Sequence, residues 1–115
     1  MIERIDTLCL RVSDIEKSSD WYQELLGLKV AFKGEGYQVL NVGDGSSVPL
    51  TIEKGDTNPG DNQSYPIFFS KDIKRTYKNL KEQGVSVSEL HNDGVNKFFN
   101  FYDLDGNKLQ VCFFE

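Results

Sequence analysis

The sequence contains one pattern of residues twice, and this duplication limits the possible folds more than any other feature. Each copy has an apolar stretch, an Asp-Ile pair, an amphipathic segment and a glycine, followed by three short apolar segments. The landmarks are 7–12, Asp14, Ile15 and Gly27 in the first copy, and 65–69, Asp72, Ile73 and Gly84 in the second. Duplicated units usually form one shared site between their copies. We therefore expect the functional residues where the two halves face each other.

Size and composition indicate a soluble globular protein. The chain has 115 residues, of which 38% are hydrophobic and 12% aromatic, which is enough for a core. No apolar run approaches the roughly 18 residues of a membrane span, and the N-terminus lacks the apolar region of a signal peptide. We therefore expect a cytoplasmic location and no membrane partner. The net charge of −5, without a stripe of Lys and Arg, argues against a nucleic-acid partner.

The first half has the residue pattern of a βαβββ unit. Alternation predicts a strand at 5–12, and Ser13 stands three residues before Glu16, the spacing of a capping box at a helix start. Gly27 supplies the left-handed exit that commonly ends a helix. Three further strands, separated by glycine-rich turns, are expected at 28–33, 37–42 and 48–53.

The second half repeats this order. Ile73, Tyr77 and Leu80 have the spacing of one helix face, and Gly84 ends the helix. The segment 103–107 has the composition of a tight turn between two strands. Strands are expected at 85–90, 97–102 and 108–114.

These elements predict an α+β fold in which two βαβββ modules form a cup-shaped mixed sheet. We expect one domain, 1–115, with module one at about 1–54 and module two at about 65–115. The segment between them, about 54–64, has no apolar residue and contains several turn formers, so it is expected to be an exposed linker.

Two motifs carry a resemblance to a known family. The first is Asp14-Ile15 followed by Ser18, Trp21-Tyr22 and 25–28. The second is 101–107, Phe-Tyr-Asp-Leu-Asp-Gly-Asn, which is close to an FxDPDGN turn with leucine in place of proline. At these residues, and over nearly its whole length, the chain resembles the vicinal oxygen chelate superfamily, which includes glyoxalases, bleomycin-resistance proteins and extradiol dioxygenases. The resemblance implies paired βαβββ modules around a cup-shaped site, commonly within a homodimer.

The resemblance also implies where a metal would bind. In metal-dependent members, the first strand of each module gives one ligand, usually histidine, and the last strand gives another, usually glutamate. The first-strand positions fall on Thr7 and Tyr65, and the last-strand positions on Thr51, or Glu53, and on Gln110. A divalent metal needs about three protein ligands from His, Cys, Asp or Glu. We therefore expect no metal and no cofactor.

Strand alternation predicts which side chains line the cup. The expected lining consists of hydroxyl, amide, thiol, guanidinium and aromatic groups. Its members are Thr7, Cys9, Arg11, Thr51, Tyr65, Phe69 and Gln110. Such a surface suits an apolar or aromatic small molecule, held by stacking and a few hydrogen bonds.

Several of these residues have a plainer structural interpretation. Core packing is favoured for Phe69, as it is for Phe99 and Phe101. Tyr65 and Gln110 are balanced between a structural and a binding role, because polar groups on a cup face need a partner. Arg11 could anchor an acidic group of a ligand or form an ion pair with one of the 18 acidic residues.

No catalytic constellation is apparent. The cysteines, Cys9 and Cys112, have no C-x-x-C spacing and fall in predicted strands, so inert buried thiols are expected. The single histidine, His91, is expected on the surface in a polar loop. Asp103 and Asp105 fall in the predicted tight turn, where aspartate bonds to nearby backbone amides.

Three functions are compatible with these features. The favoured one is a metal-free small-molecule binding protein of the superfamily, acting as a homodimer. The alternative is a divergent metal-dependent lyase, isomerase, dioxygenase or thiol transferase, which would need unusual ligands such as Glu53 and Gln110. The third is an interaction module whose cup is filled by its own side chains. One fold hosts many functions, so the fold alone does not choose among them.

Overall fold

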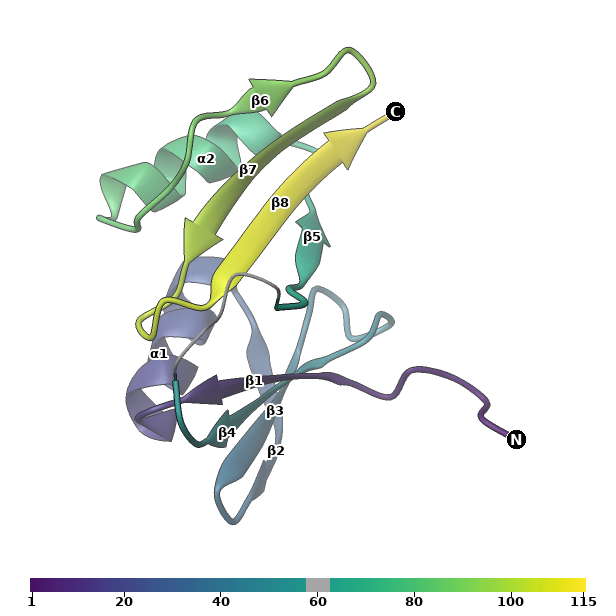
Figure 1. Cartoon of the computed structure of the whole chain (residues 1–115), viewed down its shortest axis with the longest axis vertical. Helices are drawn as coiled ribbons and strands as arrows, with labels where there is room; N and C mark the ends of the chain where they lie inside the picture. Colours follow the sequence, from purple (N-terminus) through teal and green to yellow (C-terminus); the bar gives the residue numbers. More distant parts are fainter. Residues whose placement is uncertain (58–62) are drawn as a thin grey trace. The chain divides into compact units, whose positions relative to one another are not determined.

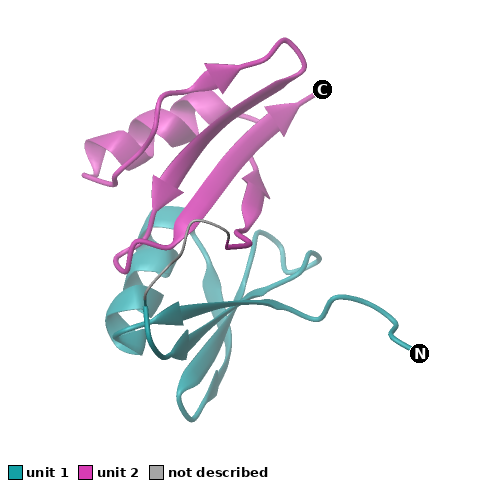
Figure 2. Cartoon of the chain, in the orientation of Figure 1, with its two compact units in different colours: residues 1–58 teal, residues 59–115 magenta. Residues whose placement is uncertain are grey.

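The computed structural model describes residues 1–57 and 63–115 (Figure 1). The chain divides into two compact units, Met1–Asn58 and Pro59–Glu115 (Figure 2). Each unit contains one four-stranded mixed sheet and one helix among the residues described. The predicted α+β class with two βαβββ modules is therefore confirmed.

In the first unit, the first and last strands of the sheet are neighbours. The elements are β1 (Leu8–Val12), α1 (Ile15–Leu26), β2 (Lys29–Gly34), β3 (Tyr37–Asn41) and β4 (Leu50–Lys54). The strand order is β1-β4-β3-β2, in which β1 and β4 are parallel and the other pairs antiparallel. Helix α1 packs on one face against β2, β3 and β4. The largest side chains buried there are Tyr22, Leu40, Leu50 and Ile52.

The second unit repeats this arrangement. Its elements are β5 (Ile67–Phe69), α2 (Ile73–Glu82), β6 (His91–Asn92), β7 (Asn96–Tyr102) and β8 (Lys108–Phe114). The order is β5-β8-β7-β6, with β5 and β8 parallel. Helix α2 covers one face through its contacts with β7 and β8 (Figure 1). Fully buried Phe99, Phe101 and Leu109 form the core of this unit together with Leu80.

Both helices begin at an aspartate. The Asp14 carboxylate accepts a hydrogen bond from the backbone N–H of Lys17 at 3.1 Å, and Asp72 is the corresponding cap of α2. The predicted capping box from Ser13 is therefore wrong, because the cap lies one residue later and Glu16 instead accepts a hydrogen bond from Gln38 in β3. Gly27 ends α1 in the left-handed conformation, as predicted.

Two predicted strands differ from the observed ones. The first begins at Leu8 rather than at residue 5, because β4 starts at Leu50 and offers no partner further upstream; Ile5 is 70% exposed. The strand predicted at 85–90 is wrong. That segment contacts β7 only at isolated points, such as the bridge between Val87 and Phe101. Regular strand pairing with β7 begins only at β6.

The remaining predicted strands agree with the structure to within about two residues. The predicted linker at 54–64 includes residues 58–62, which lie outside the described residues, and Lys54 ends β4. Across the two described ranges, no helix is both long and apolar enough to cross a membrane.

The turn between β7 and β8 is held by one buried carboxylate. Asp103 accepts hydrogen bonds of 2.9 Å from the backbone N–H groups of Asp105 and Asn107, and from the Asn107 side chain. This confirms the structural role predicted for Asp103. The turn fixes the register of the two longest strands of the second unit.

We expect Asp103→Ala to lower the free energy of unfolding by about 2 to 3 kcal/mol, because it leaves buried donors without an acceptor. Urea denaturation measures this change. Leu104→Ala is the matched control, since Leu104 is in the same turn, is 58% exposed and should cost less than about 0.5 kcal/mol. Equal losses in the two variants would contradict the role of the carboxylate.

Candidate functional site

The face of the first sheet opposite α1, here called helix-free face 1, brings four predicted site residues together. Cys9 pairs in register with Thr51, and Arg11 pairs with Glu53. The Thr7 and Thr51 hydroxyl oxygens lie 2.8 Å apart. Thr7 also donates to the carbonyl oxygen of Pro49 at 3.0 Å. The predicted grouping in the first module is thus observed, and its ligand-binding role stays a prediction.

The second pair on this face is charged. The Arg11 guanidinium lies 3.5 Å from the Glu53 carboxylate, so the ion pair that was one of the two interpretations of Arg11 is present. Cys9 is exposed, and the prediction of a buried thiol is wrong because no helix covers this face and β1 is an edge strand of the sheet. Burial in part, together with the charge of Glu53 and a hydrogen bond to it, raises the pKa of the Cys9 thiol.

The face of the second sheet opposite α2, here called helix-free face 2, carries the other predicted residues. The Gln110 amide donates to the Asn100 side-chain oxygen at 2.9 Å. The Lys108 ammonium lies 4.2 Å from the centroid of the Tyr65 ring. Phe69 pairs in register with Cys112, two residues beyond Gln110 on β8. Phe69 and Gln110 are therefore grouped on β5 and β8, and Tyr65, two residues before β5, lies at Lys108 at the start of β8.

Aromatic residues of the second unit divide between the two sides of its sheet. Phe99 and Phe101 are fully buried, as predicted, whereas Phe69 is 50% exposed and contacts Phe114 at a ring distance of 5.2 Å. Core packing is thus wrong for Phe69, because its side chain lies on helix-free face 2. Cys112 is buried as predicted, and burial raises its pKa.

His91 is exposed, as predicted, but it is not in a loop. It belongs to β6, and its ring stacks on Phe98 at a centroid distance of 5.0 Å. The polar sequence around it concealed this strand, which has only two residues.

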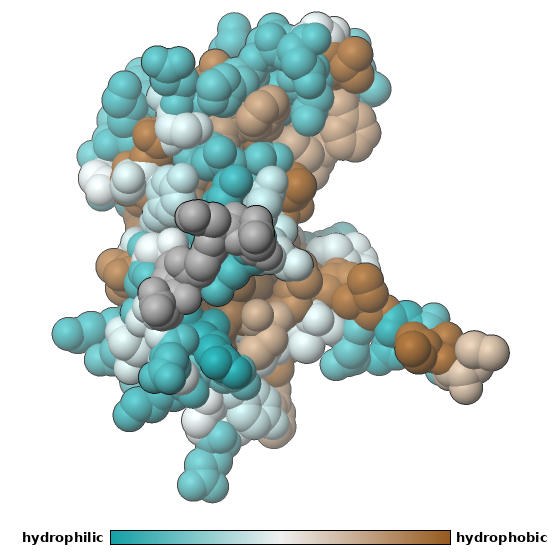
Figure 3. Space-filling view, in the orientation of Figure 1, coloured by the Kyte–Doolittle hydropathy of each residue, from teal (hydrophilic) through white to brown (hydrophobic). Residues whose placement is uncertain are grey.

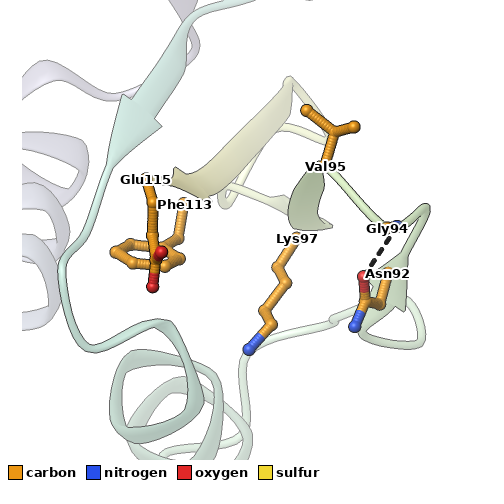
Figure 4. Close-up of a pocket in the computed structure, with 6 residues that line it drawn as sticks. All are labelled: Asn92, Gly94, Val95, Lys97, Phe113 and Glu115. Atoms are coloured by element: carbon orange, nitrogen blue, oxygen red, sulfur yellow. Dashed lines mark hydrogen bonds between the residues drawn. The ribbon is translucent and has the colours of Figure 1, made fainter.

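A cavity of about 340 Å³ lies at one end of the second sheet (Figure 4). Lys97 pairs in register with Phe113 and with Asn92, and Figure 4 shows it between these two side chains. The complete lining is Asn92, Gly94, Val95, Lys97, Phe113 and Glu115. Lys97 is two residues before the core residue Phe99 on β7, so it lies on the helix side of the sheet. None of the predicted site residues lines this cavity.

The residues at the family's metal positions do not fit a metal. In residues 1–57 and 63–115, no group of three or more His, Cys, Asp or Glu side chains could hold a metal ion. Thr7 and Thr51 bind each other, and Gln110 binds Asn100. Glu53 contributes one carboxylate and is already paired with Arg11.

The duplicated sheets and the residues on their helix-free faces define a class of protein. The family model of the Glyoxalase/Bleomycin resistance protein/Dioxygenase superfamily matches residues 4–111. The chain belongs to this superfamily, and the resemblance inferred from its motifs is confirmed.

Within the superfamily, the chain is similar to the metallothiol transferase FosB of Staphylococcus epidermidis. The two are 32% identical over 117 residues, which cover 96% of this chain and 84% of FosB. The name of this relative agrees better with our alternative, a metal-dependent enzyme, than with the metal-free interpretation.

Solved structures share the fold. The antibiotic binding protein TnmS3 from Streptomyces sp. CB03234 superposes with a TM-score of 0.83 at 23% identity, covering 99% of this chain and 98% of TnmS3. The fosfomycin resistance protein FosX from Listeria monocytogenes, in complex with Mn(II) and sulfate, gives 0.80 at 17% identity, covering 96% and 90%. At these identities the likeness establishes the fold alone.

The raised pKa of Cys9 predicts slow alkylation by iodoacetamide, with a rate that increases with pH around a midpoint above the ordinary pKa of a cysteine thiol. Glu53→Gln removes the negative charge that disfavours the thiolate, so the pKa falls and the pH profile moves to lower pH. Mass spectrometry of alkylated Cys9 measures the rate, with buried Cys112 as the internal control. A profile that is unchanged or moved to higher pH would contradict the effect of Glu53.

Proposed function

We propose that this chain binds a small apolar or aromatic molecule without a metal, on the helix-free faces of its sheets. The observation that carries the proposal is the chemistry at the family's ligand positions. Thr7, Thr51 and Gln110 are neutral groups already engaged with protein partners at hydrogen-bond distance. Neutral hydroxyl and amide groups suit direct hydrogen bonding to a ligand better than coordination of a divalent ion.

Exposed apolar side chains support the same proposal. Ile67, Phe69 and Phe114 are each at least half exposed. In Figure 3, brown and tan surface lies along β5 and the end of β8 in the second unit. Exposed apolar patches often mark binding sites, and the rings would stack on an aromatic ligand.

The second candidate is a metal-dependent thiol transferase. The 32% identity to metallothiol transferase FosB favours it. This candidate requires a metal on ligands such as Glu53 and Gln110, which supply one carboxylate between them. The two candidates therefore differ in a quantity that is simple to measure, the metal content of the protein.

We expect the purified chain to retain no stoichiometric Mn²⁺ or Zn²⁺ after loading and desalting, and its melting temperature to be unchanged by either ion. Plasma mass spectrometry and thermal shift measure these quantities. The triple variant Thr7→His, Tyr65→His, Gln110→Glu is the matched control, because it restores the family's usual ligand types. One metal ion per wild-type chain, with an increased melting temperature, would support the transferase instead.

A screen of small aromatic and apolar compounds tests binding itself. A ligand of the folded state at 100 times its dissociation constant stabilises the protein by about 2.7 kcal/mol, so the melting temperature must rise. If no compound raises it, the binding proposal fails.

We also propose that the chain forms a homodimer, since pairing would cover exposed apolar residues outside the helix-free faces, such as Ile2 and Ile5. Sedimentation velocity should show a species of twice the monomer mass at micromolar concentration. A monomer over the whole concentration range would contradict this prediction.

A further inference from the structure

Lys108 places a positive charge on helix-free face 2. Its side chain is half-buried, and its ammonium lies 4.2 Å from the centroid of the Tyr65 ring. Within residues 1–57 and 63–115, no carboxylate lies within ion-pair distance of this ammonium. The Tyr65 ring contributes a cation–π attraction, which leaves the ammonium hydrogens available to an acceptor.

Polar groups surround Lys108 on the same face. It pairs in register with Tyr102, and the next residue on this face of β8 is Gln110, which pairs with Asn100. Gln110 uses its amide N–H to bind the Asn100 oxygen. Among residues 1–57 and 63–115, the side-chain oxygen of Gln110 and the side-chain nitrogen of Asn100 make no further hydrogen bond, so the Asn100 amide can donate toward a ligand.

The opposite end of the same face is mainly apolar, with the His91 ring of β6 stacked on Phe98. Cys112 lies between Phe69 of β5 and Phe98 of β7 in the register of the sheet. Same-face residues of a strand are about 6.6 Å apart, so the distance from Lys108 to Cys112 along β8 is about 13 Å. Helix-free face 2 therefore changes from cationic to apolar over the length of a small elongated molecule.

We propose that helix-free face 2 binds an amphipathic monocarboxylic acid, with its carboxylate on Lys108 and its apolar body over Phe69 and Phe98. This inference rests on the proposed function, because it names the chemical class of the small molecule. A monoanion matches the site because Lys108 supplies a single charge, and the other lysine of these central strands, Lys97, lies on the opposite side of β7. A carboxylate also pairs with an ammonium through short charge-assisted hydrogen bonds.

The test compares decanoate with 1-decanol, which has the same chain without the charge, by calorimetry below the micellar concentration. Decanoate should bind, and Lys108→Met should weaken its binding by about 10- to 100-fold, the loss of one charge-assisted hydrogen bond. Binding of 1-decanol should be weaker and should not change in this variant. Lys108→Arg keeps the charge and should retain decanoate binding within about threefold.

Lys97→Met is the matched control, since Lys97 is also half-buried in the second unit but on the other side of the sheet. It should leave decanoate binding unchanged. Circular dichroism and melting temperature establish that each variant is folded. Chemical-shift changes at Gln110 and Cys112, rather than at the cavity residues around Lys97, should locate the ligand.

Three outcomes would overturn the assignment of the ligand class. The first is that decanoate does not bind. The second is that Lys97→Met and Lys108→Met weaken decanoate binding equally. The third is a dimer that dissociates on Lys108→Met, which would mean that Lys108 contacts a second copy of the chain. If neutral compounds still raise the melting temperature in these cases, the proposed function stands while the acidic ligand is rejected. A stoichiometric metal in the wild-type chain would instead reject the proposed function.

Discussion

The parallel pairing of the first and last strands in each unit is the constraint on which the rest of the structure depends. It places β1 against β4 and β5 against β8, although these strands are far apart in the sequence. Because of this pairing, Thr7 reaches Thr51 and Tyr65 lies at Lys108. A connection through a helix is the usual way to join parallel strands. In both units, the helix that follows the first strand covers one face of the sheet and leaves the other face open.

Much of this arrangement could be predicted because it depends on local signals. Helix periodicity, the glycine at each helix end and the turn at Asp103 each reflect interactions between residues near in sequence. The error in the cap of α1 arose where neighbouring residues compete. Ser13 and Asp14 are both good helix caps, and only the path of the chain leaving β1 selects Asp14.

The candidate site was predictable only in part. Strand alternation correctly grouped Thr7, Cys9 and Arg11, because a side chain's face depends on its position in the strand. It did not predict that Cys9 and Phe69 are exposed, because exposure also depends on the place of the strand in the sheet. Both residues lie on edge strands, β1 and β5, whereas Cys112 on the central strand β8 is buried on the same face as Phe69. The Gln110–Asn100 hydrogen bond likewise depends on cross-strand register, which the turn at 103–107 determines.

The location of the ligand positions explains how the chain can share the fold of metal-dependent relatives without their ligands. Thr7, Tyr65 and Gln110 are half-buried on helix-free faces, whereas the fully buried side chains lie under α1 and α2. Burial of apolar area under the helices supplies most of the stabilisation, so a change of side chain on the open face costs the fold little. The constraint on these positions is therefore set by what binds there, and under the proposed function the neutral residues serve a ligand that is held without a metal.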